Sequence, residues 1–207
     1  MARYPLPMFP LEHVVLPGAP LALSVFEPRY VALVKRLAAT DEPEFGTVGI
    51  RQGREVGGGE TRSEVGVVVR VVDTIEHHDG RWSIFATGTR RVAVDDWHPD
   101  DPYPIATVHD WPDPVVADLS GSVADLRASL EGLIDRLGHR EPRLPDSGSD
   151  SGVLDSVVWE LIRLAGFGPH DAMKLLALPD SSQRAQSARQ LIDERCELLD
   201  ALGHGER

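Results

Sequence analysis

The sequence has few groups of side chains whose types and spacing could do chemistry. His77, His78 and Asp79 are consecutive and combine two imidazoles with a carboxylate, which are ligands that transition metals accept. Neighbouring residues of a strand point to opposite faces, so the two imidazoles do not converge on one ion, and Asp79 suits the turn that Gly80 completes. We therefore expect no metal site and no cofactor.

Two pairs of adjacent carboxylates, Asp95–Asp96 and Asp100–Asp101, could supply a general acid and a general base. They surround an expected strand end and a proline, where acidic residues are usually solvated. The chain has no G-x-S-x-G turn for a nucleophile, and GGGE at 57–60 lacks the lysine and hydroxyl residue of a phosphate-binding loop. Cys196 is the only cysteine, which excludes an internal disulfide. We expect no catalytic residues.

Composition and charge narrow the class of partner. The chain has 207 residues, of which 42% are hydrophobic and 26% charged, as in ordinary soluble domains, and no apolar run is long enough to cross a membrane. Residues 1–117 carry 11 basic and 17 acidic side chains, and residues 118–207 carry 10 and 16, so each part has a net charge of −6. This balance argues against nucleic acid as the partner, because phosphate binding depends on Lys and Arg.

Prolines interrupt the apolar segment 9–30, so we expect no secretory signal and a cytoplasmic protein.

The first part of the chain reads as strands. Val65, Val67, Val69, Val71 and Ile75 alternate along one long segment and predict one buried face, while Val68 and Val72 make the other face apolar as well. Pro17–Gly18 and a two-residue turn at Asp79–Gly80 separate strands, and Pro28 begins a helix at about 28–39. We expect six or seven strands, at 5–9, 20–26, 44–50, 64–76, 81–88, 90–97 and 103–111, with a flexible loop at 51–63.

After Pro112 and Pro114 the hydrophobic period changes from two to 3.6. Four helices follow, in segments that begin near Ser122, at about 153, at Pro169 and after Asp180, with a loop at 140–152. The fold class is therefore α+β. We expect a curled β-barrel over residues 1–117, followed by a four-helix bundle over residues 118–207.

Several stretches resemble the N-terminal substrate-binding domain of the Lon proteases. They are LPMFPLEHVVLPGAPLALSVFEPRYVALV, GVVVRVVDTIEHHDGRWSIFATGTRRVAV, PYPIATVHDW and LLALPDSSQRAQSARQLIDERCELL, and the resemblance covers about 4–111 and 153–202. It implies a PUA-like barrel followed by a helical bundle, as in standalone bacterial proteins of this family, and recognition of proteins rather than catalysis. We expect no counterpart of the ATPase module of Lon, because GGGE at 57–60 is not a phosphate-binding loop. We expect no counterpart of its protease module either, because Lys35 and Lys174 lie in helix contexts with no serine motif around them.

The resemblance implies a module that binds polypeptide segments or partner proteins, in a groove or along an open sheet edge, and that serves as an adaptor for a protease or a chaperone. Two alternatives stay open: a PUA-like protein that binds RNA or a nucleotide, and an uncharacterised enzyme. The sequence leaves the oligomeric state undetermined. Candidate binding residues are Phe26, Arg29, Tyr30, Arg90 and Trp97, with Trp82 and Trp111 as further aromatic candidates.

Two of these candidate groups have a structural alternative. In the FEPRY segment, Tyr30 can pack inward while Glu27 and Arg29 fix the corner between a strand and a helix. Arg90 and Arg91 can pair with the many carboxylates instead of serving a partner.

Overall fold

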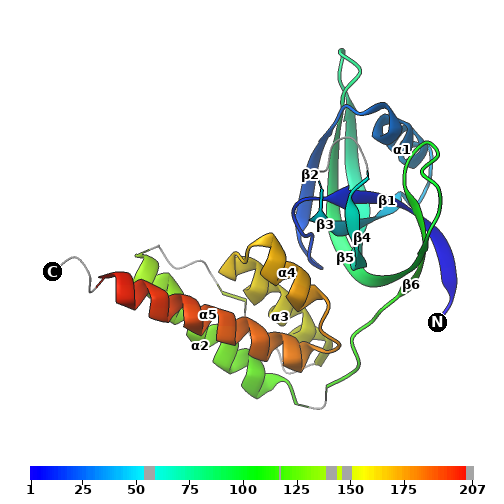
Figure 1. Ribbon diagram of the computed structural model, residues 1–207. Helices are drawn as coiled ribbons and strands as arrows, with labels where there is room; N and C mark the ends of the chain where they lie inside the picture. The colour runs from blue at the N-terminus through cyan, green and yellow to red at the C-terminus, as the bar shows by residue number, and fades with distance from the viewer. Residues whose placement is uncertain (54–58, 117, 139–143, 146–150, 204–207) are drawn as a thin grey trace. The chain divides into compact units, whose positions relative to one another are not determined.

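The computed structural model describes residues 1–53, 59–116, 118–138, 144–145 and 151–203. Their contacts divide the chain into two compact units, which we call the sheet unit (Met1–Pro112 and Gly168–Leu176) and the helical unit (Asp113–Phe167 and Ala177–Arg207). The elements, labelled in Figure 1, are β1 (Arg3–Leu11), β2 (Pro20–Val25), α1 (Pro28–Ala38), β3 (Glu44–Gln52), β4 (Thr61–Glu76), β5 (Trp82–Trp97), β6 (Ile105–Asp110), α2 (Ser120–Leu137), α3 (Ser151–Ala165), α4 (Pro169–Leu176) and α5 (Ser181–Gly203).

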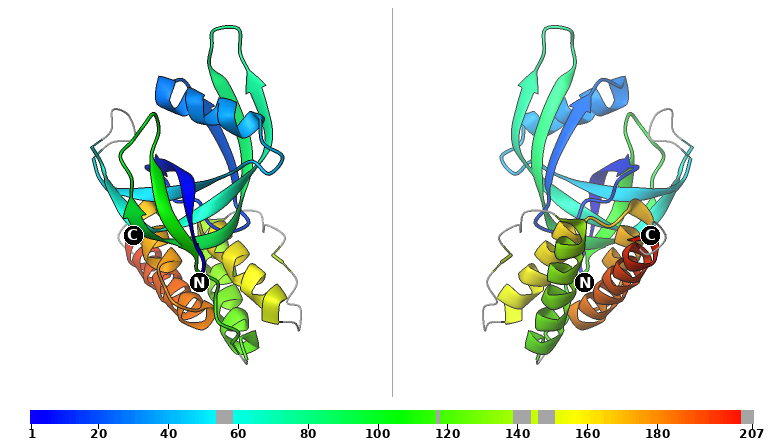
Figure 2. Two further views of the ribbon diagram at one scale, coloured as in Figure 1. Left: turned by 90° about the vertical axis from the view of Figure 1, so that its right-hand side faces the viewer. Right: turned by 90° about the vertical axis from the view of Figure 1, so that its left-hand side faces the viewer.

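The six strands form one sheet that closes on itself. Their order is β2-β5-β4-β3-β1-β6, and β5 also pairs with β6, so five strands form a ring while β2 stays outside it. β1 and β3 are parallel, and the other pairs are antiparallel. The first half of β5 pairs with β2 and the second half with β6, so this long strand joins β2 to the ring. The β4–β5 hairpin extends beyond the ring (Figure 2).

Of the six or seven expected strands, the described residues form six, because segments 81–88 and 90–97 make a single strand, β5. Gly88 lies between the two segments. Its backbone is so close to the carbonyl oxygen of Leu16 that a Cβ at this position would overlap that oxygen. A register shift against Val68 and Val69 of β4 occurs at the same place. The strand therefore bends at Gly88 without being interrupted.

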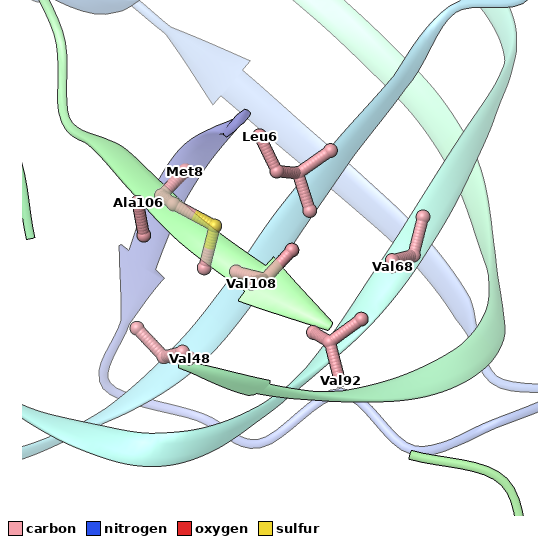
Figure 3. Packing of buried hydrophobic residues seen from close by; sticks show 7 residues of the cluster. All are labelled: Leu6, Met8, Val48, Val68, Val92, Ala106 and Val108. Atoms are coloured by element: carbon pink, nitrogen blue, oxygen red, sulfur yellow. The ribbon is translucent and has the colours of Figure 1, made fainter. Parts of the chain in front are cut away.

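The sheet buries apolar side chains on both faces. Inside the ring, side chains from five strands point toward one another (Figure 3), namely Leu6, Met8, Val48, Val68, Val92, Ala106 and Val108. On the other face, α1 packs against β4 and β5, where Tyr30 and Leu33 are buried. Val67, Val68 and Val69 are all completely buried, which confirms that this strand is apolar on both sides.

Most of the predicted turns and helix starts in this part of the chain are confirmed. Gly18 has a φ of 76°, and the amide of Ala19 donates to the carbonyl of Leu16 at 3.0 Å across Pro17–Gly18. Pro28 begins α1 as predicted. The hairpin at Asp79–Gly80 is present but wider than a two-residue turn, since the amide of His77 pairs with the carbonyl of Arg81 and Gly80 takes a φ of 82°.

The two expected loops lie partly outside the described residues, the loop at 140–152 for most of its length. At 51–63, β3 continues to Gln52 and β4 begins at Thr61, so strand pairing extends into the segment that we expected to be a loop.

The expected four-helix bundle is not confirmed, because α4 packs on the sheet. In the helical unit α2, α3 and α5 pack together. The sulfur of Met173 lies against Gly49 of β3, and the buried guanidinium of Arg91 donates to the carbonyl of Leu176 at 2.8 Å. A cation at the last carbonyls of a helix is favourable there. The expected division fell between residues 117 and 118. The compact units instead meet after Pro112, and α4 belongs to the sheet unit. None of the described helices is long and apolar enough to cross a membrane.

Candidate functional site

The corner between β2 and α1 contains three of the predicted site residues. Phe26 is 59% exposed, whereas Tyr30 is 1% exposed and stacks on the ring of Phe9 with 3.8 Å between centroids. Burial raises the pKa of Tyr30 above its ordinary value, so its hydroxyl stays neutral. The Nε of Arg29 lies 3.2 Å from Glu27, and its guanidinium covers the ring of Tyr30. The geometry matches the alternative in which Tyr30 packs inward and Glu27 and Arg29 fix the corner.

Arg62 connects this corner with Trp97. Its guanidinium lies 4.4 Å above the Trp97 ring, and its Nη2 pairs with Asp100 at 2.9 Å. Asp100 is in turn 3.9 Å from Nη1 of Arg29, and Arg62 Nε pairs with Glu60 at 2.7 Å. The structure therefore brings Arg29 and Trp97 together through Asp100, which the sequence analysis considered only as one of a pair of carboxylates, and through Arg62, which it did not single out.

Arg90 belongs to a separate polar network. It donates to Asp110 at 3.0 Å, to Glu44 at 2.9 Å and to the hydroxyl of Tyr4 at 3.3 Å, while Arg70 pairs with the same Glu44 at 2.8 Å. Tyr4 also donates to Asp110 at 2.5 Å. All five follow the strand alternation of the cluster inside the ring, and Tyr4, Glu44 and Asp110 lie near the ends of their strands. The charge of Arg90 is thus compensated within the sheet unit.

This network predicts a loss of stability in acid. Burial tends to raise the pKa of Glu44 and of Asp110, but the hydrogen bonds that each accepts, from Arg90 and from Arg70 or Tyr4, outweigh burial and lower both pKa values. A carboxyl with a lowered folded pKa stabilises the fold above its unfolded pKa and loses that contribution as the pH falls through the folded pKa. The free energy of unfolding should therefore decrease below about pH 4.5. Urea titrations across this range should show a shallower decrease for Glu44→Gln, and equal slopes would contradict the prediction.

The remaining aromatic candidates are held inside the sheet unit. Trp82 is largely buried, and Trp111 lies under the guanidinium of Arg91 at 4.4 Å, with its amide donating to the Arg91 carbonyl at 2.9 Å. The role of each candidate in binding stays a prediction.

A group of exposed apolar side chains lies on β4, on β5 and at the end of β2. We call Phe26, Val72, Ile75 and Phe85 the apolar patch; their exposed fractions are 59%, 73%, 45% and 43%. In the sheet register Phe85 lies between Ala22 of β2 and Asp73 of β4, and Ile75 is its diagonal neighbour. Trp82, Ile84 and Ala86 alternate with Phe85 and are buried on the opposite face. The patch is therefore an uncovered apolar face of the sheet.

The sequence analysis missed this patch because of one extra residue in β4. A register shift lies between Val71 and Asp73, so Val72 is a bulge and the residues after it change faces. Ile75, which alternation placed with the buried valines, is exposed for this reason. Phe85 could have been found, since it breaks the apolar alternation of Trp82, Ile84 and Ala86 in the neighbouring strand.

The described residues include no cluster of three or more His, Cys, Asp or Glu side chains suited to hold a metal ion. Burial raises the pKa of the Cys196 thiol, which disfavours the thiolate that nucleophilic chemistry needs.

Comparisons with known proteins agree with this architecture. A Lon N-terminal domain protein from Xanthomonas campestris is 25% identical, with a TM-score of 0.63 over 92% of this chain and 98% of that one. The N-terminal domain of the Mycobacterium avium complex Lon protease, 14% identical, shares the fold with a TM-score of 0.62 over the same shares of the two chains. No curated protein matches the chain. The family model of the substrate-binding domain of the ATP-dependent protease La (LON) matches residues 5–194, and the chain belongs to that family.

Proposed function

We propose that this protein is a non-enzymatic module that binds polypeptide segments at the apolar patch of its sheet unit. The exposure of Phe85 and its apolar neighbours on an uncovered sheet face carries this proposal, because soluble proteins rarely leave large apolar side chains grouped on a surface without a function. The family's description as a substrate-binding domain supports it.

The ion pairs of the sheet unit disfavour phosphate recognition. Arg29, Arg62, Arg70 and Arg90 each pair with a carboxylate of the same unit. Their charges are already compensated, which disfavours a role in holding RNA or a nucleotide.

The finer features of the proposal follow from the family and the strand ring. We infer that the closed sheet is a PUA-like barrel, that the helices after it form the bundle of that family, and that the protein acts in the cytoplasm as an adaptor for a protease or a chaperone on another chain. The ring of five paired strands supports the barrel.

Removing the apolar patch should weaken binding of an unfolded polypeptide. We expect Phe85→Ser to raise the Kd for fluorescein-labelled, reduced and carboxymethylated α-lactalbumin by about tenfold or more, measured by fluorescence anisotropy, because buried aromatic anchors dominate binding energy. Leu198→Ser removes a similarly exposed side chain from α5 and should leave the Kd unchanged. Equal loss in both variants, or no binding by the unaltered protein, would contradict the proposal.

A further inference from the structure

We propose that the outer edge of β2 takes up a bound segment as an additional strand of the sheet, and that the preferred segments alternate large apolar residues with others and carry Lys or Arg. This inference rests on the proposed function and adds to it the backbone geometry of the complex and the chemical class of the segment.

The edge of β2 is available for pairing. Within the described part of the chain β2 pairs with β5 alone, and it stands at the end of the strand order. Natural sheets usually protect such an edge with charged side chains, prolines or bulges. The sequence of β2, PLALSV, has no charged residue, and its one proline is the first residue of the strand.

The hydrogen-bond pattern identifies which backbone groups face outward. The amide of Gly88 donates to the carbonyl of Ala19 at 2.9 Å, so Ala19 directs its carbonyl toward β5. Groups of alternate residues point to the same side of a strand. Leu21, Leu23 and Val25 therefore bond to β5, while Ala22 and Ser24 direct their N–H and C=O groups to the free edge. Pro20 belongs to the same alternate set as Ala22 and Ser24. Its missing N–H group therefore removes no hydrogen bond between β2 and β5.

Only small side chains lie between this edge and the apolar patch. Ala22 and Ser24 are exposed and small, and Phe85 lies directly behind Ala22 in the β2–β5 register. Strands are about 4.8 Å apart, so a large side chain of an added strand can extend over Ala22 and contact Phe85. Phe26 follows the end of β2 and is exposed as well. Every second residue of the segment would meet this surface, which favours an apolar alternation.

The charge beside the patch favours a basic segment. Asp73 lies opposite Phe85 in the register, so the two side chains share one face of the sheet. Asp73 is exposed and forms no ion pair with a described residue. A second copy of this chain is a poor occupant, because it carries the same carboxylate and a net charge of −12.

Two isomeric peptides test the backbone geometry. Each is a fluorescein-labelled peptide in which Leu alternates with Thr between two terminal Lys residues; one isomer is N-methylated on every Leu and the other on every Thr. A strand that joins β2 uses the N–H groups of only one of its edges. We expect the Kd of one isomer to match that of the unmethylated peptide within about twofold, and the Kd of the other to rise by at least about tenfold. A difference in either sense supports strand addition, and equal affinities of the two isomers overturn it.

The remaining measurements separate this inference from the proposed function. If the unmethylated peptide and both isomers bind equally and Phe85→Ser weakens all three, the patch binds polypeptides but the edge does not. If neither the unmethylated peptide nor the unfolded protein binds, the proposed function itself fails. A peptide with Glu in place of Lys should bind at least about threefold more weakly at low salt, and Asp73→Asn should reduce that preference. A dimer in sedimentation that the unmethylated peptide cannot dissociate would identify a second copy as the occupant and overturn the inference.

Discussion

Asp113→Ala should lower the free energy of unfolding of the helical unit by about 3–5 kcal/mol, because it leaves the buried charge of Arg184 uncompensated. Arg184 is completely buried, and its two terminal nitrogens lie 3.0 Å and 2.9 Å from the carboxylate oxygens of Asp113. Its guanidinium also stacks on Trp159 at 4.0 Å and donates to the carbonyl of Leu178 at 3.0 Å. Urea denaturation followed by far-ultraviolet circular dichroism, which reports mainly on helices, measures the loss.

A matched pair on the surface supplies the control for Asp113. Arg189 and Asp125 also join α5 to an earlier part of the chain, at 2.8 Å, but both side chains are about half exposed. Asp125→Ala should therefore cost less than about 1 kcal/mol. The double variant Asp113→Ala with Arg184→Met should lose less stability than Asp113→Ala alone, because no charge stays buried. Equal effects of Asp113→Ala and Asp125→Ala would show that burial of Arg184 does not control the stability.

Gly66→Ala should destabilise the sheet unit by about 3 kcal/mol, since a Cβ at this position would overlap backbone atoms. Gly66 pairs with Val48 of β3 and with Val92 of β5 in the middle of the ring. The nearest atom to an added Cβ is the carbonyl oxygen of Thr47, and the next is Cγ1 of Val48. A carbonyl in a strand ladder cannot move without separating β3 from β4. Thermal unfolding with a near-ultraviolet signal from the tryptophans of β5 measures the change.

Gly121→Ala is the control substitution for Gly66→Ala. An added Cβ at Gly121 has no atom within 4 Å, and Gly121 lies in the first turn of α2. Alanine is favoured over glycine in a helix, so we expect a gain of up to about 0.5 kcal/mol. If Gly66→Ala were as stable as the unaltered protein, the close approach of β3 and β4 at this point would not be a constraint on the sheet.

Local chemistry was enough to predict the elements and many of their ends. Pro28 begins α1, Gly138 ends α2 with a φ of 65°, and the carboxylate of Asp180 accepts from the amide of Gln183 at 2.8 Å at the start of α5. These features depend on side chains and backbone angles within a few residues, so the sequence contains them directly. The long strand that is apolar on both sides added the expectation of a curled barrel, and the family resemblance specified a PUA-like one.

The features that the sequence did not predict depend on contacts between distant residues. Periodicity shows that α4 has an apolar face, but it does not show that Met173 meets Gly49 rather than another helix. Likewise, alternation along β4 cannot show the bulge at Val72, because the bulge is defined by the pairing with β5. The apolar patch depends on this bulge, so the candidate site was the part least accessible to prediction, although Phe26 at its margin was among the predicted residues.

The place of α4 has a consequence for the order in which the protein can fold during synthesis on the ribosome. All six strands are translated before α4, yet Gly49 of β3 meets Met173, and Arg91 donates to the carbonyl of Leu176, only when α4 has emerged. A nascent chain that has reached only residue 117 therefore holds an unfinished sheet unit. Completion of that unit waits until α2 and α3 have been made, so the N-terminal part of this chain cannot mature ahead of the rest.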